Sequence, residues 1–263
     1  MITPPPHAQH PDVYVISLKS ATARREGMER QAARLREAGY TGNVVFFEAT
    51  DAARREHLAF PQYSPFWANV AGTPLTDGER ACFASHYRLW KKCAEERPAS
   101  GMVVLEDDAE ILPEAFVETV EECVRAPWEC VRIFVTNERP FRRIEGNFYT
   151  CEKGGNGTVG YFLRPSAAEK FLRASARWLR LADDFLDRYW EHGVAYVVRR
   201  PYPLRLLGLE SAIDAADGAT RGDAGRYRRH RAWWARPFRE LFRLVERVKK
   251  MRGRRKLFRE LFG

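Results

Sequence analysis

The chain has 263 residues, which is enough for one sizeable domain and an appendage. Its five cysteines are an odd number and form no C-x-x-C pair, a pattern that argues against a disulfide framework and against a zinc site. The N-terminal segment lacks the apolar core of a secretory signal, and no stretch approaches the ~18 apolar residues of a membrane span. We therefore expect a cytoplasmic protein that is either soluble or bound to a membrane surface.

The net charge of +9 is distributed unevenly along the chain. Residues 226–263 contain fifteen Lys or Arg and three Glu, so this segment carries +12 and the other 225 residues carry −3. The body is therefore slightly acidic and the tail strongly basic, so we consider the two parts of the chain separately. We predict a disordered N-terminus over residues 1–11, an α/β domain over 12–216, a linker rich in Gly and Asp over 217–225, and a basic tail over 226–263.

The first elements form a strand–helix–strand unit. Residues 12–18 are a strand by composition and length, and residues 44–48 are a second strand. Between them, residues 22–38 show helical spacing, with Met28 and Leu35 on one face. This order is typical of a parallel sheet with a right-handed crossover.

Three cations stand at the turn and in the first helical turn of this unit: Lys19, Arg24 and Arg25. Cations at this position oppose the helix dipole, so a structural role is less favourable than usual. Two interpretations remain open. These residues anchor an anionic ligand such as a diphosphate, or they lie on a solvated helix face.

After an irregular loop over residues 51–74, a long helix is predicted to start at the capping box Thr76-Asp77-Gly78-Glu79. The helix runs to about Glu96 and is apolar on so much of its circumference that it belongs in the core. His86 is the unusual residue on it. A buried, hydrogen-bonded structural histidine is the default, and a contact with the substrate is the alternative. Metal ligation ranks third, because we identify no second ligand one helical turn away.

A strand over residues 102–105 runs directly into three consecutive carboxylates, Glu106, Asp107 and Asp108. Ligands of open α/β sheets gather at the carboxyl ends of the strands. Two unit charges about 4 Å apart repel by several kcal/mol at an effective dielectric near 20, and a divalent ion with oxygen ligands would relieve that repulsion. Carboxylates suit Mg²⁺ or Mn²⁺ better than zinc. The alternative is a solvated acidic exit from the strand.

A glycine-rich stretch interrupts the remaining elements. We predict helices over 113–125 and 165–173, strands over 131–135, 161–163 and 194–198, and a loop or hairpin over 139–152. The stretch from Gly154 to Gly160 contains GNGTVG, but it comes too late in the chain for a dinucleotide-binding turn. Its glycines indicate close backbone approach to a ligand or a tight turn.

Four segments together resemble a known family: VYVISLKSATARRE (13–26), LTDGERACFASHYRLWKKC (75–93), VVLEDDAEI (103–111) and GTVGYFLRPSAAEKFL (157–172). The family is glycosyltransferase family 25, a group of lipopolysaccharide and lipooligosaccharide biosynthesis enzymes that includes β-galactosyltransferases. The resemblance covers about residues 12–214. Its most specific parts are the L-T-x-G-E-x-x-C-x-x-S-H and L-E-D-D segments, in that order and separation.

The resemblance implies a GT-A-type fold, with a Rossmann-like, mostly parallel sheet flanked by helices that binds a UDP-sugar and Mn²⁺ or Mg²⁺. By position, the acidic triplet corresponds to the family's D-x-D motif, which implies Glu106 and Asp108 as metal ligands, Asp108 being the direct one. The residues implied for donor binding are Ser17, Leu18, Arg24, Arg25, Glu79, His86, Glu106, Asp107, Gly160 and Tyr161. The sequence departs from the family where Glu106 replaces an Asp and where Glu210-Ser211-Ala212-Ile213 lacks the acid expected before the isoleucine.

The resemblance also implies inversion, in which a carboxylate takes the proton of the attacking acceptor hydroxyl. The metal-bound triplet cannot be this base, because its lone pairs face the ion. A second acid pair, Asp183 and Asp184, supplies the candidates, and Asp183 is preferred because its position matches the family. A helix N-cap explains one of these two acids without any chemistry.

The basic tail from Arg226 lies outside the resemblance. Apolar residues recur near helical spacing from Phe238 to Met251, a second short run follows Gly253, and Trp233-Trp234 precede both. This composition is typical of a basic amphipathic helix on an anionic membrane. The alternatives are a helix packed on the catalytic body and a nucleic-acid-binding tail. The acidic body and the lack of a recognition module argue against nucleic acid as a partner.

The function that we expect is therefore metal-dependent, inverting transfer of a hexose, galactose first, from a UDP-sugar. The acceptor would be lipopolysaccharide, lipooligosaccharide or another glycan. A lipid-linked acceptor would place the enzyme peripherally on the inner face of the cytoplasmic membrane. The alternatives are a nucleic-acid-binding protein and a non-catalytic scaffold that acts through its basic tail.

Overall fold

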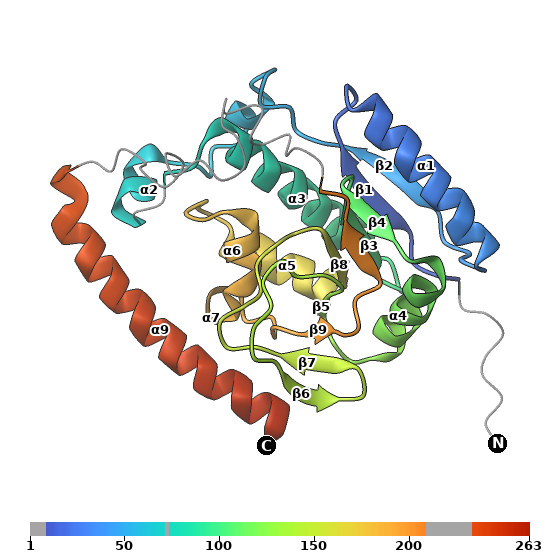
Figure 1. Ribbon diagram of the computed structural model, residues 1–263. Coiled ribbons are helices and arrows are strands. Elements are labelled where there is room, and N and C mark those ends of the chain that lie inside the picture. Colours follow the sequence, from blue (N-terminus) through green and yellow to red (C-terminus); the bar gives the residue numbers. More distant parts are fainter. Residues whose placement is uncertain (1–8, 72–73, 209–232) are drawn as a thin grey trace.

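The computed structural model describes residues 9–71, 74–208 and 233–263. One mixed sheet lies between two groups of helices, and a long C-terminal helix runs along one side of this body (Figure 1). The fold is therefore α/β with a C-terminal helix, as the sequence predicts. The predictions for residues 1–8, for the linker at 217–225 and for the segment at 210–213 lie outside the described residues.

The predicted strand–helix–strand unit is confirmed. β1 (Val13–Ser17) pairs in parallel with β2 (Val44–Glu48) on one side and with β3 (Met102–Glu106) on the other. α1 (Thr22–Glu37) makes the crossover, and the residues predicted for its inner face are buried. The body begins before residue 12, because the ring of His10 stacks on Tyr40 with the ring centroids 4.6 Å apart.

Beyond β3 the sheet is mixed, in the order β2-β1-β3-β8-β5-β9-β7-β6. The added strands are β8 (Gly160–Leu163), β5 (Cys130–Arg132), β9 (Val198–Arg199), β7 (Phe148–Thr150) and β6 (Arg142–Glu145). β8 is antiparallel to both β3 and β5, so the sheet departs from the predicted mostly parallel arrangement there, whereas β1 to β3 and the β5–β9 pair are parallel. β6 and β7 form the hairpin that is one of the two predictions for residues 139–152.

Two predicted strands are shorter than expected. β5 ends three residues early, and β9 retains one residue of the predicted run 194–198. After β5 the chain turns toward the glycine-rich stretch, where the N–H of Thr136 donates to the carbonyl of Asn156 at 3.2 Å. Val194 and Val197 are nevertheless buried. These apolar runs therefore reflect burial in the core rather than strand pairing, a distinction that periodicity alone does not make.

The remaining described elements surround the sheet. They are η1 (Glu56–Ala59), α2 (Pro65–Ala71), α3 (Asp77–Glu96), β4 (Ala109–Ile111), α4 (Pro113–Arg125), α5 (Pro165–Ala174), α6 (Ala182–Asp187), α7 (Tyr189–His192), β10 (Leu204–Leu206), η3 (Trp233–Ala235) and α9 (Arg236–Phe262). The predicted capping box at the start of α3 is confirmed. The loop predicted over 51–74 contains η1 and α2, which are too short to produce a recognisable helical period.

The side chains of β3 alternate between two cores. Met102 and Val104 pack against α3 and α5 on one face of the sheet. Val103 and Leu105 pack against α1 and α4 on the other face. Because every residue of β3 from Met102 to Leu105 is buried, the strand is held rigidly and fixes where the acidic triplet that follows it can point.

α9 is one continuous helix through Gly253, the residue that separates the two apolar runs of the sequence. It runs from α2 to the β6–β7 hairpin (Figure 1), and the guanidinium of Arg142 lies 3.6 Å from the ring centroid of Phe262. Gly253 faces Trp190 of α7 so closely that an added Cβ would lie 2.4 Å from the Trp190 Cβ. The glycine therefore allows close packing instead of ending the helix.

Replacing Gly253 with Ala tests this packing, because helix propensity and overpacking change the free energy of unfolding in opposite directions. At an exposed helix position the change would stabilise the helix by about 1 kcal/mol. Against Trp190 we expect overpacking to cost about 1–3 kcal/mol and to lower the melting temperature. Thermal unfolding followed by circular dichroism, with Arg255→Ala on the exposed side as the control, measures the difference. A higher melting temperature for Gly253→Ala would show that α9 does not pack on α7.

Candidate active site

The carboxyl ends of β1, β2 and β3 lie side by side. Ser17 at the end of β1 is in register with Glu48 at the end of β2. Ile16 is in register with Glu106 at the end of β3. Three parallel strands therefore end together, which is where open α/β sheets bind their ligands.

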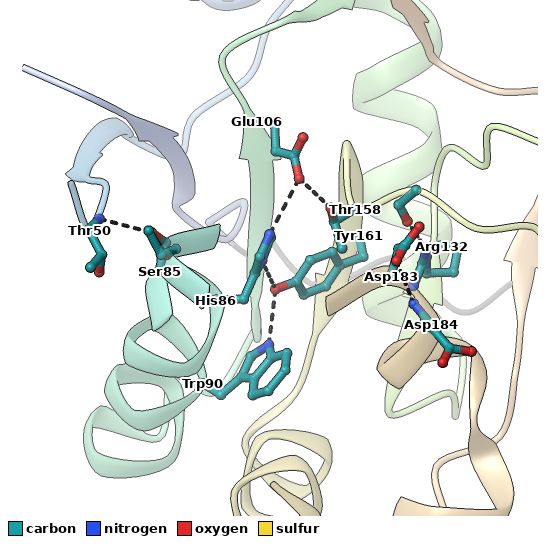
Figure 2. Close-up of polar contacts among 12 residues, drawn as sticks. Thr50, Ser85, His86, Trp90, Glu106, Arg132, Thr158, Tyr161, Asp183 and Asp184 are labelled. Atoms are coloured by element: carbon teal, nitrogen blue, oxygen red, sulfur yellow. Dashed lines mark hydrogen bonds and ion pairs between the residues drawn. The ribbon is translucent and has the colours of Figure 1, made fainter. Parts of the chain in front are cut away.

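A cavity of about 840 Å³ opens at this edge of the sheet. Its walls come from the end of β1, the first turns of α1, residues 49–53, one face of α3 and the acidic turn after β3. The N–H of Thr50 donates to Ser85 Oγ at 2.9 Å and joins two of these walls (Figure 2). The volume falls within the range of about 300–1,000 Å³ that is usual for small-molecule and cofactor sites.

Glu106 and Asp107 point to opposite faces of the sheet, because successive residues of a strand alternate. Asp107 faces α1 and is 9% exposed. Its Oδ1 accepts a hydrogen bond from Arg24 Nη1 at 2.8 Å, and its Oδ2 accepts one from Ser17 Oγ at 2.7 Å. Both oxygens of Asp107 are thus occupied, and a cation of α1 balances its charge.

Glu106 faces α3 and ends a chain of hydrogen bonds (Figure 2). Trp90 Nε1 donates to the Tyr161 hydroxyl at 3.0 Å, and that hydroxyl lies 3.0 Å from His86 Nδ1. His86 Nε2 lies 3.4 Å from Glu106 Oε1, which also accepts from the Thr158 hydroxyl. Each proton has an acceptor when Tyr161 donates to Nδ1 and the Nε2–H of His86 donates to Glu106.

The same chain of hydrogen bonds favours the ionised form of Glu106. Burial opposes ionisation of the carboxyl group, but hydrogen bonds from His86 and Thr158 prevail and lower its pKa. Tyr161 has no exposed surface and His86 is 1% exposed, so solvent does not reach these two members of the hydrogen-bond chain. His86 is therefore the buried, hydrogen-bonded histidine of the default prediction, and it also lines the cavity.

Asp108 is the member of the triplet whose charge is least compensated. Its Oδ1 is buried and has no hydrogen-bond partner among the described residues. Burial, followed by the nearby charges of Glu106 and Asp107, raises the pKa of Asp108 to about 6. An unpartnered carboxylate oxygen beside two other carboxylates favours a cation.

The sequence interpretation of His86 missed Cys82, which stands four residues before it and one turn away on α3. One ligand atom each from Cys82, His86 and Glu106 lie within 4.8 Å of one another. The statement that His86 has no second ligand one helical turn away is therefore wrong. Burial is the largest cause that raises the pKa of the Cys82 thiol, and the carboxylate of Glu106 raises it further, so the neutral thiol is favoured.

Six of the residues predicted for donor binding line the cavity: Ser17, Leu18, Arg24, His86, Glu106 and Asp107. Arg24 and Asp107 are paired with each other, so Arg24 reaches the cavity from a fixed position. Lys19 is directed elsewhere, because its Nζ forms an exposed ion pair with Glu48 at 2.8 Å.

The other four residues predicted for donor binding have structural roles and are absent from the described lining. The guanidinium of Arg25 lies over the ring of Phe46 at 4.7 Å. Glu79 closes the capping box by accepting the N–H of Thr76 at 2.9 Å. Gly160 lies where a Cβ would meet Leu204 at 2.3 Å. Tyr161 contacts the cavity indirectly, through its hydrogen bond to His86.

Asp183 and Asp184 lie in the first turn of α6, and the N-cap of this helix is Leu181. Neither acid is therefore the predicted N-cap. Asp184 forms ion pairs with Arg180 at 3.7 Å and with Arg188 at 3.8 Å. Asp183 forms no ion pair among the described residues. Its Oδ1 accepts the N–H of Asp184 at 2.7 Å, and its Oδ2 lies 3.5 Å from Asn156 Nδ2.

A buried pair that the sequence analysis did not single out supports the glycine-rich stretch beside Asp183. Arg132 is 2% exposed and donates to the carbonyl of Gly157, and its Nη1 lies 3.9 Å from Asp187 Oδ1. Asp187 Oδ2 accepts the N–H of Asn156 at 2.9 Å. Gly154 has a φ of +70°, and an added Cβ would lie 2.2 Å from Asp187 Oδ2. The close approach predicted for the glycines is thus to the protein's own side chains.

Glu106 and Asp183 lie on the same side of the sheet, the side of α3 (Figure 2). Phe185 of α6, the helix that contains Asp183, packs on Phe83 of α3 with the ring centroids 5.5 Å apart. Figure 2 shows Asp183 beside Arg132, with Thr158 and Tyr161 between this pair and His86. A ligand in front of Thr158 would therefore meet Glu106 on one side and Asp183 on the other.

The profile of "Glycosyltransferase family 25 (LPS biosynthesis protein)" matches residues 10–186. The chain belongs to glycosyltransferase family 25. The matched region contains the acidic triplet, the described walls of the cavity up to residue 108 and both members of the second acid pair, and it ends before α9. Family 25 membership supports a glycosyltransferase role for this chain.

Relatives in family 25 come from bacteria and from animals. The chain is 36% identical over 96 residues to a lipooligosaccharide biosynthesis protein (lic2B) of Haemophilus influenzae, covering 36% of this chain and 32% of the relative. It is 27% identical over 196 residues to procollagen galactosyltransferase 1-A of Xenopus laevis, covering 70% and 32%. It is 28% identical over 190 residues to the inactive glycosyltransferase 25 family member 3 of Homo sapiens, covering 66% and 31%. The alignments thus span about a third of each relative.

Proposed function

We propose that the chain transfers a sugar from a nucleoside diphosphate sugar to a glycan acceptor with the help of a divalent ion. The observation that carries this proposal is the buried Oδ1 of Asp108, which has no hydrogen-bond partner in the described part of the chain and lies beside the cavity at the carboxyl edge of β1 and β3. An unpaired anionic oxygen at this edge is suited to a cation, and the cation is suited to a diphosphate.

The residues present fit Mn²⁺ or Mg²⁺. Asp108 and Glu106 would hold the ion, because hard oxygen donors suit these cations and Asp107 already has both oxygens occupied. A bound ion would act as a Lewis acid that stabilises the charge developing on the leaving diphosphate. Through its chain of hydrogen bonds, His86 keeps Glu106 ionised and fixed in orientation.

The diphosphate side of the donor fits the start of α1. This helix has no side-chain cap and no acid in its first turn, and the cavity is lined there by Ala21, Ala23 and Arg24. Free N–H groups at a helix N-terminus, together with a guanidinium, attract phosphate oxygens. Arg24 would serve both Asp107 and the donor.

Asp183 is the better candidate for the general base. It forms no ion pair among the described residues and lies beside the glycine-rich stretch, whereas Asp184 is placed between two arginines. In an inverting transfer, the acceptor hydroxyl attacks the anomeric carbon while Asp183 takes its proton. The bond from that carbon to the phosphate oxygen breaks, and its electron pair leaves with the diphosphate.

The names of two relatives support the choice of substrates. One relative is a lipooligosaccharide biosynthesis protein and another is a procollagen galactosyltransferase. UDP-galactose is therefore the first donor to test, and a lipid-linked or soluble glycan is the acceptor class. A GT-A-type donor site at the carboxyl edge of β1 and β3 is part of this proposal.

A panel of nucleotide sugars tests the proposal. Purified full-length protein is incubated with each donor, a mixture of glycan acceptors and Mn²⁺, and nucleoside diphosphate release and product mass are measured. We expect release and a hexose-sized mass gain with one UDP-sugar, and neither when EDTA replaces Mn²⁺. A chain that binds UDP and Mn²⁺ but releases no diphosphate with any donor would be a non-catalytic family member and would contradict the proposal.

A further inference from the structure

α9 packs on the body through a face that contains charged residues. The positions that point inward include Ala235 just before the helix, followed by Arg239, Glu246, Gly253 and Leu257, and the half-buried Phe242 and Leu261 also contact the body. Glu246 forms an ion pair with Arg188 of the body, and each of these side chains is 11% exposed. One of the predicted alternatives, packing of the tail on the body, is therefore present, but the contact does not use the helix's main apolar stripe.

That apolar stripe lies on the opposite face of α9 and points away from the body. Its members are exposed over 43–62% of their surface and are Phe238, Leu241, Leu244, Val245 and Met251. Large contiguous apolar patches are rare on the surface of monomeric proteins, and where they occur they usually mark an interaction surface.

The stripe continues onto α2. The ring of Trp234 stacks on Phe66, with the ring centroids 5.4 Å apart, and Phe66 makes an edge contact with Trp67 at 5.2 Å. Trp234 is 38%, Phe66 50% and Trp67 37% exposed. We call Phe66, Trp67, Trp234 and the stripe of α9 together the outer apolar surface. It is built from two separate parts of the chain that the structure holds in contact.

The charge around the outer apolar surface is strongly positive. α9 contains eleven Lys or Arg and three Glu. Arg243, Arg247 and Lys249 are exposed beside the stripe, and Arg252 and Arg255 are exposed near its C-terminal end. Arg177 lies over the ring of Trp67 at 4.6 Å and places a cation at the α2 end.

We propose that the outer apolar surface docks on an anionic phospholipid bilayer. Leu, Phe and Met side chains would enter the boundary between headgroups and acyl chains, tryptophans favour this interface, and the flanking cations attract anionic headgroups. None of the helices among the described residues is long and apolar enough to cross a bilayer. In the proposed docking, α9 lies along the membrane surface.

The charges make other partners less favourable for this surface. A second copy would bring together two helices that each carry a net charge of +8. A nucleic acid would pair with the cations but would leave the aliphatic side chains of the stripe without a partner. An anionic bilayer satisfies both the charges and the apolar groups.

This docking goes beyond the proposed transfer reaction and does not depend on it, since binding to vesicles can be measured without a substrate. It places the catalytic body at a membrane surface, where a lipid-linked acceptor would lie. It also agrees with a peripheral location on the inner face of the cytoplasmic membrane, which the sequence predicts.

Co-sedimentation of the full-length protein with vesicles tests the proposal. One set of vesicles contains equal parts of phosphatidylglycerol and phosphatidylcholine, and the other contains phosphatidylcholine alone. Point variants are used in place of a truncation, because removal of α9 would uncover Trp190 and Arg188. The test variant is Leu241→Glu/Leu244→Glu. The matched control is Val45→Glu/Leu58→Glu, which adds the same charge at two exposed apolar residues outside the surface.

We expect the wild type and the control to bind phosphatidylglycerol vesicles and the test variant to bind roughly tenfold more weakly or worse. Raised salt should weaken wild-type binding, and thermal unfolding should show the test variant folded. Equal binding by test and control variants would overturn the proposal, as would absence of wild-type binding. Self-association or oligonucleotide binding that the test variant loses while vesicle binding is unchanged would also overturn it and would identify a second copy or a nucleic acid as the partner.

Discussion

Replacing Asp108 with Asn is expected to lower turnover by about 10³-fold and to remove the effect of Mn²⁺ on donor affinity. The neutral amide is a poor ligand for a hard cation, and loss of Lewis-acid stabilisation worth about 4 kcal/mol corresponds to a rate loss of that size. Without metal, the variant should be at least as stable as the wild type. Burial and two neighbouring carboxylates disfavour the charge of Asp108, as its raised pKa of about 6 indicates.

Steady-state kinetics, UDP binding with and without Mn²⁺, and thermal unfolding measure the three parts of this prediction. Glu110→Gln is the matched control, because it removes a carboxylate from β4 that is absent from the described lining of the cavity. It should retain turnover and the response to Mn²⁺. Unchanged Mn²⁺-dependent turnover in Asp108→Asn would remove Asp108 from the metal site.

Replacing Asp183 with Asn is expected to lower turnover by about 10²–10⁴-fold, the usual effect of losing a positioned general base. Donor affinity should stay close to the wild-type value, because the base acts on the acceptor hydroxyl. Asp183 is suited to this role because it forms no ion pair among the described residues. The measurement is kcat with a saturating donor, alongside UDP affinity from calorimetry.

Asp184→Asn is the matched control for Asp183, one residue along the same helix. The Asp184 side chain is 41% exposed and its ion pairs are long, so we expect a loss of less than about 1 kcal/mol in unfolding free energy. Turnover should change little. If Asp184→Asn loses turnover and Asp183→Asn does not, the two roles must be exchanged.

The sequence predicts those elements whose structure is determined by short-range sequence patterns. The β1–α1–β2 unit and the capping box of α3 follow from periodicity and from a defined side-chain pattern, and both are present. The position of the acidic triplet follows from the buried strand that precedes it. The alternation along β3 then assigns Glu106 to α3 and Asp107 to α1, a division that the sequence analysis does not predict.

Contacts between distant parts of the chain could not be predicted in the same way. The Arg132–Asp187 pair joins residues 55 positions apart, and the only sequence signal is one basic residue within an apolar run. Cys82 stands one helical turn before His86, but its position on a largely apolar helix is also typical of a core residue. On α9, the pattern predicts an apolar stripe, but only the body decides which face is buried. Gly253 and Glu246 contact α7 and Arg188, and the stripe stays exposed.

Binding of Mn²⁺ followed by electron paramagnetic resonance tests the central claim most directly, because the signal of free Mn²⁺ falls when the ion is bound. With UDP present, we expect wild-type protein to bind a single Mn²⁺ per chain and Asp108→Asn to bind almost none, while Glu110→Gln behaves as the wild type. Equal Mn²⁺ binding by the wild type and Asp108→Asn would contradict a metal-assisted donor site at the carboxyl edge of β1 and β3.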